Sequence, residues 1–120
     1  MPHLTLEYTQ NLSGFDAGRA LRAINQASLD SGLFGESDIK SRALPLDQYL
    51  TGIEPVPRAF VHVRIALLSG RSAHERKALA DAVLAALLRA VDLPPGLEIQ
   101  FSVETTDLDR PSYAKAVHHG

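Results

Sequence analysis

A repeated tripeptide divides the sequence into two similar halves. Leu-Ser-Gly occurs at residues 12–14 and again at residues 68–70. Each copy follows a segment with the pattern of a β-strand and precedes a helical pattern, which leads into a further strand. We therefore interpret the chain as two βαβ units, with pseudo-repeats at about residues 2–44 and 59–105. Two such units predict a single α+β domain over residues 1–120, with a four-stranded mixed sheet and two helices on one face.

The first strand is predicted at residues 2–9, where apolar and polar side chains alternate. Leu4 and Leu6 lie on one face of this period-two pattern, and polar side chains lie on the other. Pro2 begins the strand, a position that tolerates a residue without a backbone N–H donor. Because even-numbered positions share a face, we expect Pro2 to point with the two leucines toward apolar surroundings.

A helix is predicted at about residues 16–31, where apolar positions follow helical spacing. Asp16 is a suitable N-cap for it, and Gly32 is a suitable stop. A second strand is expected near residues 38–44, and the stretch at 45–58, which contains several prolines, is expected to be a long connection. Strand, helix and strand at this spacing predict two parallel strands joined by a crossover helix.

The second half has the same order of elements. A strongly β-type run at residues 60–68 is followed by Ser72 and Glu75, which form the S-x-x-E capping box of a second helix. That helix is expected to run to about Val91, because the two prolines beyond it cannot continue a helix. The last strand is predicted at residues 97–105. Since both helices cover one face of the sheet, we expect the other face to be apolar and to be buried in an oligomer.

The Met1-Pro2 start suggests chemistry at the chain terminus. An initiator methionine is normally removed when the next residue is small, which would leave Pro2 with a free secondary amine. An ordinary α-amino group titrates near pH ~8, and apolar surroundings lower its pKa, so this amine could act as a base at neutral pH. The alternative is that Met-Pro has no catalytic role, as in many chains that begin this way.

Three cationic side chains are candidates for binding an anion. Lys40 and Arg42 lie two residues apart on a predicted strand, so both heads project from the same face. They form either a solvated edge or a clamp for carboxylates. Arg71 lies just before the N-terminus of the second helix, where the helix dipole also favours an anion. It is either a surface loop arginine or a fixed cation that stabilises developing negative charge.

Composition excludes several classes of function. The chain has no cysteine, so disulfides, thiolate nucleophiles and thiolate metal sites are ruled out. The net charge of −2 provides no basic surface for nucleic acid. No signal peptide or membrane-spanning run is present, so we expect a cytoplasmic domain without a membrane partner. The adjacent His118 and His119 are weak evidence for a metal, and we expect no metal and no cofactor.

In Pro2, the doubled βαβ pattern and Gly70-Arg71-Ser72, the chain resembles the tautomerase superfamily. The segment from Leu68 to Lys77 is similar to the Gly-Arg-Ser helix start of 4-oxalocrotonate tautomerase, whose chains are about half as long. Over its full length, the chain more closely resembles 5-carboxymethyl-2-hydroxymuconate Δ-isomerase. The segments that carry this resemblance are Pro2-His3-Leu4 through Glu7-Tyr8, Ile39-Lys40-Ser41-Arg42, Ala59-Phe60-Val61-His62, Gly70-Arg71-Ser72 and Tyr113-Ala114-Lys115.

The resemblance implies a tautomerase-like tandem β-α-β fold, a homotrimer and a cofactor-free isomerase. The substrate would be 5-carboxymethyl-2-hydroxymuconate or a similar carboxylated dienol from the breakdown of aromatic compounds. Pro2 would be the catalytic base and then the acid, and Arg71 would bind a substrate carboxylate. Lys40 stands where the family typically has arginine, and it keeps the charge without the bidentate fork. Arg42 matches a second arginine and could share that role.

The departure at Lys40 leaves two alternatives open. One is a tautomerase that acts on another 2-hydroxymuconate-like or phenylpyruvate-like acid. The other is a trimeric scaffold that has the fold without the activity.

Overall fold

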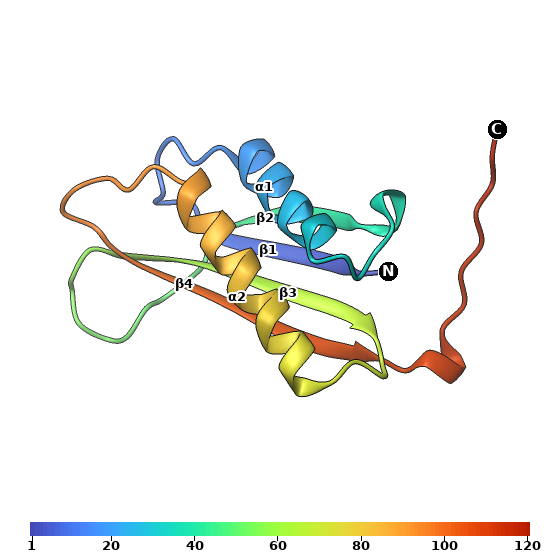
Figure 1. Cartoon of the computed structure of the whole chain (residues 1–120). Coiled ribbons are helices and arrows are strands. Elements are labelled where there is room, and N and C mark those ends of the chain that lie inside the picture. The colour runs from blue at the N-terminus through green and yellow to red at the C-terminus, as the bar shows by residue number, and fades with distance from the viewer.

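The computed structural model describes residues 1–120 and contains two strand–helix–strand units in succession (Figure 1). The strands and long helices are, in chain order, β1 (His3–Thr9), α1 (Ala17–Asp30), β2 (Lys40–Leu46), β3 (Arg58–Leu68), α2 (Ala73–Ala90) and β4 (Glu98–Leu108). Two single-turn 3-10 helices, η1 (Glu36–Asp38) and η2 (Arg110–Ser112), precede β2 and follow β4.

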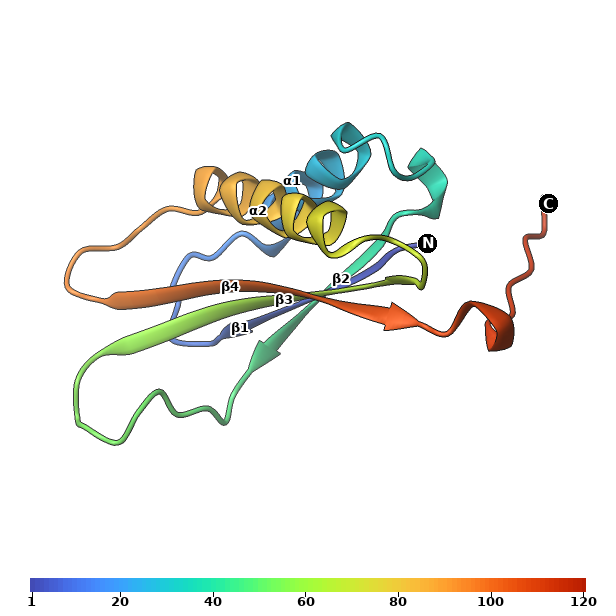
Figure 2. The same ribbon diagram turned by 60° about the horizontal axis from the view of Figure 1, so that its bottom comes forward.

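The four strands form one mixed sheet in the order β2-β1-β3-β4. β1 is parallel to β2, and β3 is parallel to β4, as crossover helices require, whereas β1 and β3 are antiparallel. Both helices lie on one face of the sheet, and no helix covers the other face (Figure 2). The predicted α+β class, mixed sheet and one-sided helical layer are therefore confirmed. No helix in the structure is both long and apolar enough to cross a membrane.

The hydrophobic core lies between the sheet and the two helices. Alternate residues of β3, from Ala59 to Leu67, are buried there together with Leu4 and Leu6 of β1. Pro2 is less than 2% exposed, and the alternation of β1 puts it on the same face as the two leucines. The prediction that Pro2 points toward apolar surroundings is confirmed.

Side-chain caps fix where both helices begin. Asp16 is the N-cap of α1, and its carboxylate accepts a hydrogen bond from the Arg19 N–H at 3.0 Å. Ser72 and Glu75 form the predicted capping box at the start of α2, with reciprocal hydrogen bonds of 3.1 and 3.0 Å. These contacts satisfy N–H groups that have no partner within a helix. They also hold the preceding residue, Arg71, close to the start of α2.

Two strands extend beyond their predicted ends. β2 begins at Lys40 and continues through Pro45, which we had expected in the connection. Proline is tolerated there because β2 is an edge strand, whose outer side makes no ladder hydrogen bonds. β4 continues to Leu108 because it pairs with β3 along its whole length.

The face of the sheet without helices is polar, so the prediction that it is apolar was wrong. Strand register gathers there His3, Thr5 and Glu7 of β1, Lys40 and Arg42 of β2, His62 and Arg64 of β3, and Ser102 and Glu104 of β4. His62 makes hydrogen bonds to Ser102 and Glu104, and Arg64 lies 3.6 Å from the same carboxylate. Leu44, Phe60 and Ala66 also lie on this face, so it is mainly polar with a few apolar side chains. The character of this face therefore does not support the oligomer that we inferred from it.

Candidate active site

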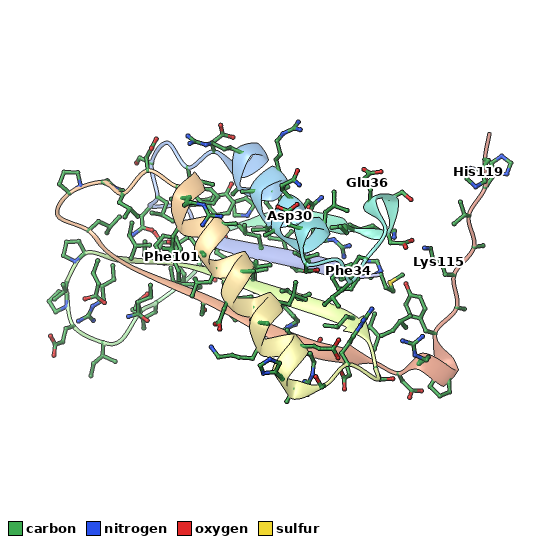
Figure 3. The ribbon with its side chains drawn as sticks, viewed as in Figure 1. Asp30, Phe34, Glu36, Phe101, Lys115 and His119 are labelled. Atoms are coloured by element: carbon green, nitrogen blue, oxygen red, sulfur yellow. The ribbon has the colours of Figure 1, made fainter.

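A pocket of about 380 Å³ lies at the end of the sheet where β1 begins and β3 and β4 end. β1 is antiparallel to β3, so the start of the chain meets the start of α2 and the C-terminal tail at this end. Figure 3 shows Phe34 beside this end of the sheet and Lys115 on the tail that passes it. The pocket is lined by Met1, Phe34, Asp38, Leu67, Leu68, Arg71, Arg110, Tyr113 and Lys115.

The chain terminus is held tightly in this pocket. The Pro2 carbonyl accepts a hydrogen bond from the Lys40 N–H at 3.1 Å, which continues the pairing of β1 with β2 to the first residues. The Met1 side chain is only 5% exposed, and its amine lies 4.0 Å from Asp38 Oδ1. Burial lowers the pKa of the Met1 amine; Asp38 opposes this shift, while Lys40 and Lys115 add to it. The lower pKa means that more of the Met1 amine is in its neutral, proton-accepting form at neutral pH than it would be in water.

Arg71 is the only one of the three predicted cations that lines the pocket. Its Nη2 donates to the Leu33 carbonyl at 3.0 Å, and its guanidinium carbon lies 5.7 Å from the centre of the Phe34 ring. These two contacts orient the guanidinium. Because a guanidinium has five N–H donors, most remain available to a carboxylate ligand.

Lys40 and Arg42 lie beside the pocket and do not line it. Register with His3 and Thr5 of β1 puts both on the helix-free face of the sheet. Lys40 Nζ donates to the Asp38 carbonyl at 2.9 Å, and Arg42 Nη2 lies 2.8 Å from His3 Nδ1. The two cations share a face, as expected from their spacing, whereas Arg71 lies in the loop between β3 and α2.

Sequence reasoning did not select Asp38, Arg110, Tyr113 or Lys115 as site residues. Lys115 Nζ lies 2.7 Å from Asp38 Oδ1, and this hydrogen bond is the main reason that the pKa of Asp38 is lowered. The Tyr113 hydroxyl contacts the Met1 sulfur at 2.8 Å. These contacts join residues that are far apart in sequence, so no local pattern indicates them. The only available signal was the resemblance carried by Tyr113-Ala114-Lys115.

The charges in the pocket favour an anionic ligand. Arg71, Arg110 and Lys115 line it against a single carboxylate, that of Asp38. The structure has no group of three or more His, Asp or Glu side chains arranged to hold a metal ion. The arrangement thus combines a desolvated amine, cationic side chains and one tyrosine hydroxyl, which are the groups needed to bind an organic acid and move a proton.

The mixed sheet built from two βαβ units is the fold of the tautomerase superfamily. Residues 2–118 match the family model of 5-carboxymethyl-2-hydroxymuconate isomerase, and the chain belongs to that family. This match confirms the resemblance found in the sequence and shows that the chain is a member of an isomerase family.

Solved structures agree with the assignment. A 5-carboxymethyl-2-hydroxymuconate isomerase from Deinococcus radiodurans R1 is 30% identical, with a TM-score of 0.84 over 98% of this chain and 90% of that one. A 5-carboxymethyl-2-hydroxymuconate delta-isomerase is 20% identical, with a TM-score of 0.73 over 100% and 89% of the two chains. A fused 4-OT protein described as a symmetric trimer is 17% identical, with a TM-score of 0.74 over 95% and 91%. These last two show the shared fold. No curated protein matches the chain.

Proposed function

We propose that this protein moves a double bond in 5-carboxymethyl-2-hydroxymuconate or a similar carboxylated dienol, with the Pro2 amine as proton shuttle after removal of Met1. The observation that carries the proposal is the chain terminus itself. Its amine lies in a pocket lined by cations, and burial lowers its pKa. Removal of Met1 would transfer the terminal amine to Pro2, which is buried at the start of β1.

The proposed reaction needs one group that both accepts and returns a proton. The neutral Pro2 amine would take the proton from the dienol hydroxyl, and the O–H electron pair would become the C=O π bond. The displaced double-bond electrons would form a new C–H bond with the proton that the ammonium returns to carbon. A group with a pKa near neutrality is suited to both steps.

Arg71 is the proposed ligand for a substrate carboxylate, with Lys40 and Arg42 as candidates for a second one. Support for Arg71 comes from its position in the pocket wall and from the contacts that orient its guanidinium. Support for Lys40 comes from its electrostatic effect on the terminal amine, which requires it to lie nearby. Arg42 is the weakest of the three, because its guanidinium contacts His3.

A homotrimer is part of the proposal. The loop between β2 and β3 extends away from the rest of the sheet (Figures 1 and 2), and it exposes Leu50 and Ile53 by 77% and 93%. Large apolar side chains exposed together are typical of a surface that is covered by a partner. Two fused 4-OT proteins with the same fold are described as symmetric trimers.

The departure at Lys40 favours a second candidate function, tautomerisation of another 2-hydroxymuconate-like or phenylpyruvate-like acid. Lysine cannot bind a carboxylate through two parallel hydrogen bonds as arginine can, so a substrate with fewer carboxylates would suit this site. A panel of dienols followed by ultraviolet absorbance separates the two candidates, because the preferred substrate has the highest kcat/KM.

The decisive experiment compares two preparations of the same protein, one beginning at Met1 and one beginning at Pro2, each verified by intact mass. In the first, the Pro2 nitrogen is a tertiary amide and has no basicity. We expect the preparation that begins at Pro2 to be active and the other to be nearly inactive. Equal activity would remove Pro2 from the mechanism. No activity of either preparation on any dienol would favour a scaffold without activity.

A further inference from the structure

We propose that Tyr113 is a further catalytic residue that donates a hydrogen bond to the substrate oxygen that becomes negative, and that His3 and Arg42 are positioning residues for its hydroxyl. This inference rests on the proposed function. It comes from a chain of side-chain contacts that crosses from the helix-free face of the sheet into the pocket.

The first contact fixes the proton on the His3 ring. Arg42 Nη2 lies 2.8 Å from His3 Nδ1, and a guanidinium nitrogen can only donate. Nδ1 must therefore be the acceptor, and a neutral ring then carries its proton on Nε2. Burial makes the largest contribution to lowering the pKa of His3, and the charges of Arg42 and Lys40 lower it further. The ring is therefore neutral around pH 7.

The second contact fixes the direction of the tyrosine hydroxyl. His3 Nε2 lies 3.2 Å from the Tyr113 oxygen, so the Nε2–H donates to that oxygen. The phenolic proton must then point elsewhere, and it is directed to the Met1 sulfur at 2.8 Å. A thioether is a weak acceptor. Without Met1, the same O–H group would face the pocket and be free to donate to a bound oxygen.

The tail that carries Tyr113 is anchored on both sides of this residue. Before it, Arg110 donates from its backbone N–H and its Nε to Ser69, at 3.2 and 3.0 Å. After it, Lys115 Nζ lies 2.7 Å from Asp38 Oδ1. Tyr113 is therefore held against the pocket, and its hydroxyl is preorganised for the oxygen of a dienolate. Such donors stabilise charge that develops during a reaction without reorganising at that moment.

The test uses protein that begins at Pro2 and the dienol on which the wild type is most active. Tyr113→Phe should lower kcat by about 10²-fold, the effect expected for one oxyanion donor, and change KM much less. Tyr8→Phe is the matched control, because Tyr8 lies at the other end of β1 and packs on Phe15. It should leave kcat unchanged.

Variants of His3 separate positioning from a merely structural role. His3→Leu removes the donor to Tyr113 and should lower kcat, whereas His3→Gln keeps an N–H group near the position of Nε2 and should restore most of it. In the double variant with Tyr113→Phe, His3→Leu should cause no further loss, because both changes remove the same interaction. Nitrogen-15 NMR should show the Nε2–H tautomer of His3 in the wild type and a tautomer mixture in Arg42→Gln.

The outcomes distinguish this inference from the proposed function. If the wild type turns over a dienol and Tyr113→Phe is equally active, the role of Tyr113 is refuted while the proposed function stands. An Nδ1–H tautomer of His3, or additive losses in the double variant, would refute the positioning role. A wild type that begins at Pro2 and turns over no dienol refutes both.

Discussion

Replacing Arg71 with alanine should weaken the binding of a carboxylate substrate more than it slows the chemistry. A hydrogen bond between charged groups contributes about 1.5–3 kcal/mol, so its loss should lower kcat/KM by about one to two decades, chiefly through KM. The same change removes the donor to the Leu33 carbonyl and the contact with the Phe34 ring. Losing a hydrogen bond from the charged guanidinium and a cation–π contact should lower the free energy of unfolding by about 2–4 kcal/mol.

Two measurements separate these effects. Steady-state kinetics in the ultraviolet assay reports substrate binding, and thermal denaturation reports stability. Arg71→Lys keeps the charge but loses the planar fork, so its kcat/KM should lie between those of Arg71→Ala and the wild type. Arg22→Ala, an exposed position on α1, is the control and should change neither quantity.

Lys40→Ala and Arg42→Ala complete the experiment. A residue that binds a second carboxylate should raise KM when it is removed. If Arg42 instead acts through His3, its removal should lower kcat with little change in KM. Wild-type kinetics in the Arg71, Lys40 and Arg42 variants alike would refute the cationic clamp.

The remaining predictions concern assembly, pH and stability. Light scattering should give three times the chain mass of 13.0 kDa, and a monomer at micromolar concentration would refute the trimer. For protein that begins at Pro2, the profile of activity against pH should have an ascending limb near neutrality, because the neutral amine is the base. Asp38 raises the pKa of the Met1 amine, and we expect it to act in the same way on a Pro2 amine at the same end of β1. Asp38→Asn should therefore move that limb to lower pH, and an unmoved limb would show that Asp38 has no effect on the amine. The hydrogen bond from His62 is the main reason that the pKa of Glu104 is lowered in the folded protein. The ionised Glu104 therefore stabilises the fold at pH values above the pKa of an unfolded glutamate, and this stabilisation is lost as the pH falls through the pKa of the folded state. Urea titrations at several pH values should show this loss in the wild type and not in Glu104→Gln. Ser72→Ala should lower the free energy of unfolding by about 1 kcal/mol, measured by urea denaturation, because it removes the cap of α2.

The sequence by itself determined the elements and much of what each one buries. The alternation in β1, the Asp16 cap and the capping box of α2 are signals within a few residues, and the structure contains all three. The inward direction of Pro2 follows from the same alternation, because side chains on a strand point to opposite faces in turn. Such signals can be read from sequence because each depends only on neighbouring residues.

The composition of the pocket was decided by tertiary structure. Antiparallel pairing of β1 with β3 brings the chain terminus to the end of β4, where the tail places Tyr113 and Lys115 beside Met1 and Asp38. Register also puts Lys40 and Arg42 on the polar face, outside the lining of the pocket that Arg71 helps to form, although all three are plausible anion ligands in sequence. These relations join residues tens of positions apart, and their geometry depends on strand order and register, which local periodicity does not encode.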